Sequence, residues 1–502
     1  MMFASPFLWL MMIPLAGFPL IYLIGRAGKR LGASKASISF WMALLALLVM
    51  VLPLYQLGGQ VLAGQMPVLR LNAITLRMDG VGLLLSGTVL ALAIAVTLFS
   101  YRYVGSEEGE EKYYALLLAM SGVIIGLGCA ADLFNLWVWF EAMAVTSYLL
   151  VAFYRNQPGA LEAGVKYVIQ SACGSVLVVL GIALVFTHSR SLGLLQIPAK
   201  IAMPAPLVLV AGVFFVVGFG VKSALVPLHT WLPDAHSQAP SGISAMLSGV
   251  VIEAGLVALL RSLGVLSGLG APIATLLLIF AVLNMLVGNL MALRQTQIKR
   301  LLAFSSVSHI GYMLLGLAAA LGFGAASGAG GSFFHILTHA LMKGLAFLSA
   351  GLLLYCLRIA AGSHEPLTVD DLAGAARRYP LAAFAFSVAV LGLGGLPPLA
   401  GFMSKWQIFV GGFQTQSPLL QWLVVFAALN SVLSLGYYAP LVNRIYRKQP
   451  SDIVLAGKAA PFTMNLVLLV LSAAVVVLGF APGLVNALTE SAAVSLLSAF
   501  GL

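Results

Sequence analysis

The sequence predicts an all-α polytopic membrane protein with about fourteen transmembrane helices. Three observations support this: 61% of the 502 residues are hydrophobic, 8% are charged, and the mean hydropathy is +1.05. An ordinary soluble domain carries about 25% charged residues, so this composition excludes a soluble globular domain. The net charge of +11 then belongs to membrane loops, and we expect no nucleic-acid partner.

Apolar runs long enough to cross a bilayer core of about 30 Å predict the helices in chain order. They cover residues 6–25, 37–55, 80–100, 113–131, 133–153, 160–187, 206–227, 239–262, 270–293, 299–322, 330–357, 380–411, 420–444 and 461–487. The first run lacks the basic start of a signal peptide, so we expect a retained helix. Residues 58–79 are too polar to span and predict a loop with a short hairpin from Val68 to Leu76.

The loop cations indicate the orientation. With the N-terminus outside, seventeen Lys and Arg residues fall on inner loops, Lys35, Lys299 and Lys448 among them. Five fall on outer loops, namely Arg70, Arg77, Arg190, Lys200 and Arg261. The positive-inside rule therefore favours both termini outside.

Four lysines lie within predicted helices: Lys166, Lys222, Lys343 and Lys405. A cation at bilayer depth costs about 2.5–3.5 kcal/mol, which makes each a functional candidate.

The seventh and twelfth helices form a matched pair. Lys222 precedes Pro227 on the seventh, and Lys405 follows Pro398 on the twelfth. Helices five apart cross the membrane in opposite directions, as in inverted-repeat transporters with broken helices. We expect inverted units of helices 4–8 (residues 113–262) and 9–13 (residues 263–444), flanked by segments 1–112 and 445–502. The alternative is that proline and glycine are merely tolerated in buried helices.

Carboxylates are few within the spans. Glu141 and Glu253 lie in apolar helices, where each needs a partner or a water-filled cavity. Glu162 and Lys166, four residues apart, can pair on one helix face. A carboxylate near Lys222 predicts a proton switch, and a static ion pair is the alternative.

Residues 330–357 carry a titratable stripe. His335, His339 and Lys343 follow at four-residue spacing, and His309 lies on the preceding helix. Imidazoles can relay protons. A zinc enzyme is disfavoured because no HExxH pattern is present, and haem ligation stays an alternative that a haem absorbance band would reveal. Cys129, Cys173 and Cys356 show no metal or haem spacing, and we expect small core residues.

Four strings together resemble the proton-conducting membrane transporter family. They are Val221-Lys-Ser-Ala-Leu-Val-Pro-Leu-His-Thr-Trp-Leu-Pro-Asp-Ala-His236, Ile298-Lys-Arg-Leu-Leu-Ala-Phe-Ser-Ser-Val-Ser-His-Ile-Gly311, His335-Ile-Leu-Thr-His-Ala-Leu-Met-Lys343 and Gly395-Leu-Pro-Pro-Leu-Ala-Gly-Phe-Met-Ser-Lys405. This family includes antiporter-like subunits of respiratory complex I, of Mrp-type sodium/proton antiporters and of membrane-bound hydrogenases. The resemblance covers residues 79–405 and implies fourteen helices with two inverted five-helix units.

The resemblance also implies residue roles. Glu141 and Lys222 match the family's gating pair. His335, His339 and Lys343 match its central stripe, and Lys405 matches the terminal relay lysine. Secondary candidates are His229, Asp234 and His236 around the broken helix, with His309, Glu162 and Lys166.

One position departs from the family pattern: Glu253 stands where a lysine is usual. The charge is reversed, so a cation-to-cation transfer cannot operate unchanged. A buried glutamate can relay a proton or pair with a histidine, and its oxygens can also favour sodium.

The sequence thus predicts a proton-translocating, antiporter-like membrane subunit of a complex I-like (NADH:quinone oxidoreductase or related) assembly. The alternatives are an Mrp-type antiporter subunit, a hydrogenase pumping subunit and a non-pumping structural subunit. We expect no cofactor in this chain, because it has no nucleotide, flavin or cluster motif. Expected partners are other membrane subunits, membrane lipid and H⁺ or Na⁺, in a bacterial or archaeal cell membrane.

Overall fold

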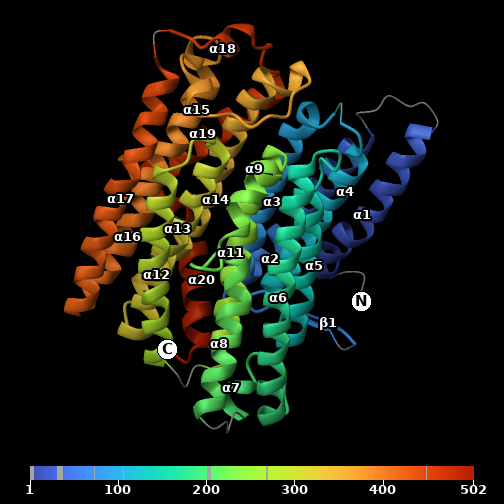
Figure 1. The fold of residues 1–502 in the computed structure, drawn as a ribbon. Helices are drawn as coiled ribbons and strands as arrows, with labels where there is room; N and C mark the ends of the chain where they lie inside the picture. Colours follow the sequence, from blue (N-terminus) through green and yellow to red (C-terminus); the bar gives the residue numbers. More distant parts are fainter. Residues whose placement is uncertain are drawn as a thin grey trace.

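The computed structural model describes residues 5–30, 38–72, 74–105, 107–200, 205–266, 270–447 and 449–502. Lys35 and Lys448, two of the cations assigned to inner loops, lie outside these residues. Long helices run side by side, with α1 at one edge of the bundle and α16 and α17 at the other (Figure 1).

The elements follow one another in chain order. The first half contains α1 (Pro6–Arg30), α2 (Ile38–Leu62), β1 (Val68–Leu71), β2 (Ile74–Arg77), α3 (Gly80–Tyr103), α4 (Glu110–Cys129), α5 (Leu133–Val151), α6 (Pro158–Ser189), α7 (Ile197–Lys200), α8 (Ala205–Lys222), α9 (Trp231–Gln238), α10 (Ser241–Met246), a π-helical turn (Leu247–Val251) and α11 (Ile252–Gly264). The second half contains α12 (Gly270–Leu293), α13 (Ile298–Phe323), α14 (Ala326–Leu357), α15 (Pro380–Gly394), α16 (Ala400–Gln414), α17 (Pro418–Ile445), α18 (Asp452–Ala456), α19 (Phe462–Phe480) and α20 (Asn486–Ala499).

The chain is an integral membrane protein. Twelve helices of the described residues are long and apolar enough to cross a membrane, and the shorter apolar helices Pro206–Lys222 and Pro380–Gly394 add to them. Large apolar side chains such as Tyr55 (79% exposed) and Trp422 (73% exposed) cover the outer faces, where they would contact lipid. Only helices and closed barrels satisfy all backbone groups within a bilayer, which explains why hydropathy located these helices.

Three predicted helices differ from the observed ones. The predicted helix 206–227 is too long, because α8 ends at Lys222, and the predicted helix 380–411 divides into α15 and α16. The predicted helix 239–262 is interrupted by the π-helical turn just before Glu253. The C-terminal helix α20 was not predicted. It packs against α3 and α14, and its Ser495 hydroxyl accepts a hydrogen bond from the Gly80 amide at 2.9 Å.

The predicted hairpin is confirmed, with β1 and β2 antiparallel and Leu69 opposite Leu76. It lies at the end of the bundle opposite α18 (Figure 1). Directly after it, Asp79 caps α3 by accepting a hydrogen bond from the Gly82 amide at 2.9 Å. A negatively charged cap suits a helix N-terminus, whose first amides lack partners within the helix.

Asp79 also forms a two-point ion pair with Arg261. The Arg261 nitrogens donate to the two Asp79 oxygens at 3.0 and 2.8 Å, and one also donates to the Gly128 carbonyl at 2.5 Å. Burial disfavours the Asp79 charge, but Arg261, the Gly82 amide and Arg77 outweigh it and lower the pKa of this carboxyl. Arg261, which the loop count places on an outer loop, is therefore a largely buried link between α11, α3 and α4.

The core centres on α14, which packs against α13, α15, α16, α19 and α20. A Cβ at Gly401 of α16 would lie 2.0 Å from the Gly392 carbonyl oxygen, so only glycine permits this approach of α16 to α15. The close packing brings the start of α16, with Ser404 and Lys405, against the polar side chains of α14.

Both helix breaks leave backbone groups that side chains satisfy. After α8, Trp231 Nε1 donates to the Val221 carbonyl at 2.7 Å, and Asn284 of α12 binds the Val226 amide and the Ala224 carbonyl at 2.9 and 3.0 Å. At the end of α15, Gly395 adopts φ +81° and Lys405 Nζ donates to the Leu393 carbonyl at 2.8 Å. Each break is thus a stable feature held by specific side chains.

Candidate functional site

The site is built around the stripe on α14. His335, His339 and Lys343 have no exposed surface, and all three point toward neighbouring helices in the core. Their hydrogen-bond partners come from α11, α13 and α16.

Glu253 is bonded directly to this stripe. Its Oε1 lies 2.7 Å from His339 Nδ1, and both side chains have no exposed surface. Glu253 Oε2 has no hydrogen-bond partner among the described residues. The sequence left three roles for Glu253: proton relay, pairing with a histidine and sodium binding. The structure shows the pairing with a histidine. A π-helical turn, Leu247–Val251, ends two residues before Glu253, and such turns often mark functional positions.

Two further imidazoles continue from His339. Its ring centroid lies 5.0 Å from that of His309, and His309 Nδ1 lies 2.9 Å from His335 Nε2. His339 Nε2 has no partner among the described residues, so transfer from His339 to His309 needs a ring rotation or a bridging water. Which ring nitrogens carry protons depends on the tautomers, and the geometry accommodates both directions.

Ser404 joins the imidazoles to the second broken helix. Its Oγ lies 2.8 Å from His335 Nδ1, and Lys405 is the next residue. The Lys405 ammonium donates to Ser431 Oγ at 2.8 Å and lies 4.5 Å above the Tyr312 ring. The buried line therefore extends from Glu253 to Ser404, which adjoins Lys405.

Lys343 lies off this line. Its ammonium donates to the Leu302 carbonyl at 2.8 Å and to Ser305 Oγ at 2.5 Å, both on α13. Ser305 is in turn hydrogen-bonded to the Tyr438 hydroxyl. The stripe at four-residue spacing is thus real, but its third member faces a different set of partners from the two histidines.

The predicted pair of Glu141 and Lys222 is open in this structure. The two groups form no ion pair within 4.0 Å, although the Glu141 charge acts on Lys222. Lys222 instead donates to Ser171 Oγ at 3.2 Å, and buried Glu141 Oε1 has no partner among the described residues. The two groups are therefore not in contact in this structure, and their role as a switch stays a prediction.

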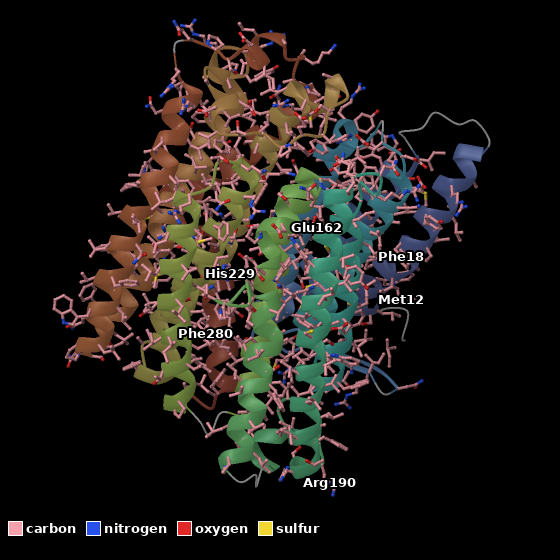
Figure 2. The ribbon with its side chains drawn as sticks, in the orientation of Figure 1. Met12, Phe18, Glu162, Arg190, His229 and Phe280 are labelled. Atoms are coloured by element: carbon pink, nitrogen blue, oxygen red, sulfur yellow. The ribbon has the colours of Figure 1, made fainter. Side chains whose placement is uncertain are left out.

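Glu162, Lys166 and Asp234 form a more exposed network. The predicted pair of Glu162 and Lys166 is confirmed at 2.8 Å, with Lys166 about half exposed and Glu162 about two-thirds exposed. Lys166 also binds Asp234 at 3.0 Å, and Arg300 pairs with the other Asp234 oxygen. Figure 2 shows Glu162 near one end of α6 and Arg190 near the other. These charges hold α9 against α6 and α13 and lie apart from the buried line.

The two histidines around the first break are buried. His229 lies in the link after α8, within the bundle (Figure 2), and its Nδ1 has no partner among the described residues. The His236 ring stacks on Phe347 at 4.6 Å, and neither of its nitrogens has a described partner. Phe347 is one helical turn beyond Lys343, so His236 lies near that lysine.

Several contributing residues were missed or misplaced from the sequence. Lys299, assigned to an inner loop, is buried and donates to the Ala239 carbonyl at 2.5 Å. Ser404 was quoted only as part of a motif, and the aromatic partners of the two broken-helix lysines were not identified. No local pattern marks the aromatic partners, because Tyr167 and Tyr312 lie on α6 and α13, away in sequence from the lysines that they face.

The described residues contain no group of three or more histidine, cysteine, aspartate or glutamate side chains that could hold a metal ion. The expectation of three core cysteines is wrong for one of them: Cys129 and Cys356 are buried, whereas Cys173 is exposed on α6.

A membrane bundle with a buried line of titratable groups defines a class of protein that conducts ions within its interior. A family model described as NADH:quinone oxidoreductase/Mrp antiporter, TM, matches residues 130–434. F(420)H(2) dehydrogenase subunit N of Methanosarcina mazei is 33% identical over 417 residues, which cover 81% of this chain and 82% of that protein. NADH-quinone oxidoreductase subunit N of Desulforamulus reducens is 31% identical over 414 residues, with coverages of 81% and 83%. The chain belongs to the NADH:quinone oxidoreductase/Mrp antiporter membrane family.

Solved structures agree with this assignment. A chain of the membrane-bound sulfane sulfur reductase, an archaeal respiratory membrane complex, superposes with a TM-score of 0.84 at 25% identity and 98% coverage of both chains. A chain of respiratory complex I from Thermus thermophilus gives a TM-score of 0.74 at 27% identity, with 94% of this chain and 98% of that chain covered.

Proposed function

We propose that this chain is a proton-translocating, antiporter-like membrane subunit of a complex I-like assembly. The observation that carries the proposal is the buried line Glu253–His339–His309–His335–Ser404, which leads to Lys405. Each member can hold or transfer a proton, and none is exposed to the exterior by more than a few per cent.

The names of the relatives favour a redox-driven assembly. NADH-quinone oxidoreductase subunit N and F(420)H(2) dehydrogenase subunit N are each named as one subunit of a dehydrogenase. By analogy, other membrane subunits are the partners of this chain, and electron transfer takes place in the partners. Its residence is the cell membrane of a bacterium or archaeon.

The proposed topology has fourteen spans. The twelve long helices and the two shorter apolar helices that end at the breaks, all among the described residues, together support this number. Residues 113–262 and 263–444 are then two inverted five-helix units, between segments 1–112 and 445–502. Lys222 ends α8, and Lys405 lies on α16 just after the second break, so each unit contributes a lysine at its broken helix. Both termini are placed on the outer side by the cation count of the loops.

The proposed mechanism begins at Glu141 and Lys222. A change in a partner subunit closes or opens this pair, and the altered charge shifts the proton on Glu253. The proton then moves through the three imidazoles to Lys405. Moving one charge across the membrane requires about 2.3 kcal/mol for each 100 mV of membrane potential.

The test uses the assembly that co-purifies with the tagged chain, reconstituted in liposomes and driven by its electron donor in sodium-free buffer. We expect donor-driven acidification that a protonophore abolishes, and we expect Lys222→Ala to reduce this chain's share of it at least about tenfold per electron transferred. Acidification equal to wild type in this variant would support a non-pumping structural subunit. Exchange of sodium for protons without any electron donor would support the Mrp-type alternative.

A further inference from the structure

The ammonium of Lys222 lies on an aromatic surface. Its Nζ is 4.1 Å from the centroid of the Tyr167 ring and 5.7 Å from that of Trp231. Its one hydrogen bond to a described residue is the contact with Ser171. A cation within about 6 Å of a ring face is attracted by the ring quadrupole, more strongly where water is excluded. Lys222, Tyr167 and Trp231 all have no exposed surface, so this condition is met.

The two rings are fixed to the helix break. They stack with centroids 3.9 Å apart and planes inclined by 5°. Trp231 Nε1 donates to the carbonyl of Val221, the residue before Lys222, which is available because α8 ends there. The aromatic pair is therefore held at a set position beside the lysine that it faces.

Lys222 has two neighbours that can stabilise its charge. An ammonium has three donors, and only the one directed at Ser171 is used by the described residues. On one side are the rings, and near by is Glu141, whose buried Oε1 has no described partner. The lysine side chain is flexible enough to reach different positions from one backbone anchor.

We propose that Tyr167 and Trp231 form a second binding position for the Lys222 ammonium, which competes with Glu141. The proposal rests on the proposed function and deepens it. When Lys222 leaves Glu141, its charge moves onto the ring faces instead of bare hydrocarbon, and this lowers the cost of the open state. Tyr167 is then a positioning residue that sets the balance between the closed and open pair.

The second broken helix repeats the arrangement. Lys405 has a tyrosine face, that of Tyr312 at 4.5 Å, and a serine hydroxyl, that of Ser431 at 2.8 Å. Lys343, which is equally buried but follows no break, has no such ring among the described residues. A tyrosine face and a serine hydroxyl thus accompany the two lysines at the breaks.

The test separates the ring face from the hydroxyl. The Tyr167 hydroxyl has no hydrogen-bond partner among the described residues. Tyr167→Phe should therefore keep this chain's share of donor-driven acidification within about twofold of wild type, whereas Tyr167→Leu should lower that share about tenfold. Equal acidification in the Leu variant and the wild type would overturn the proposal.

A graded substitution covers the case in which Tyr167→Leu does not assemble. Phenylalanine at position 167 with one, two or three ring fluorines keeps its size while the ring face loses negative potential. We expect acidification to fall stepwise with each fluorine, and a flat series would contradict the cation–π contact.

A double-variant cycle links the rings to Glu141. Because both act on one ammonium, Glu141→Gln combined with Tyr167→Leu should lose less than the product of the two single effects. Independent, multiplying effects would overturn the competition. Lys222→Ala separates the two proposals. If this variant pumps as wild type, the proposed function fails. If Lys222→Ala is inactive while Tyr167→Leu pumps normally, only the aromatic binding position fails.

Discussion

Replacing Glu253 with glutamine tests the relay at its least expected member. Gln keeps the size of the side chain and a hydrogen-bonding partner for His339 Nδ1, which lies 2.7 Å from Glu253 Oε1. It removes the group that can release or accept the proton. Loss of a general acid–base partner costs about 100-fold to 10,000-fold in rate, so this chain's share of pumping should fall at least about 100-fold.

The assay is acidification of liposomes that contain the assembly, followed with a pH-sensitive dye at equal rates of electron transfer. Glu162→Gln is the matched control, since it makes the same chemical change at a carboxylate that is 66% exposed and paired with Lys166. An exposed pair contributes about 0–1 kcal/mol, so this control should pump nearly as wild type. If Glu253→Gln pumps as well as Glu162→Gln, the relay through Glu253 is refuted.

Further predictions concern the ion pair of Asp79 and Arg261 and the hydroxyl of Ser404, which lies between His335 and Lys405. Asp79→Asn leaves the buried Arg261 charge without its partner and should lower the free energy of unfolding by about 3–5 kcal/mol, measured by thermal unfolding in detergent. Folding lowers the pKa of Asp79, so its charge stabilises the folded protein above the pKa of the unfolded chain, which is about 4. This stabilisation is lost as the pH falls through the lower pKa of the folded protein. Only the wild type should show this acid-dependent loss, because Asp79→Asn cannot titrate. Ser404→Ala removes the 2.8 Å contact with His335 and should lower this chain's share of acidification about tenfold, while Ser404→Thr, which keeps the hydroxyl, should restore most of that share. Full pumping in the Ala variant would exclude Ser404 from the path.

Much of the fold follows from hydropathy, because a bilayer admits few backbone arrangements. The proline-containing breaks and the hairpin were also predicted correctly. The helix α20 was missed since its residues 486–499 are only moderately apolar, and its place depends on contacts with α3. The end of α8 at Lys222 depends on side chains such as Trp231 that bind freed carbonyls, which no local pattern reveals.

The sequence identified most residues of the candidate site but not how their side chains contact one another. Spacing on one helix placed His335 and His339 together, but the contact between His339 and Glu253 depends on the register of two helices distant in sequence. For the same reason, Lys343 was expected on the line and instead binds α13. Lys299 was misplaced because a cation near a helix start looks the same in sequence whether it faces water or a buried carbonyl.

The central claim is that protons cross the membrane by way of the buried line that leads to Lys405. The most direct measurement is the number of protons translocated per electron pair by the reconstituted assembly, compared between wild type and Lys405→Ala. The proposed mechanism predicts a lower ratio in the variant, since the route through this chain is closed while partner subunits continue to work. An unchanged ratio, with the assembly intact, would contradict it.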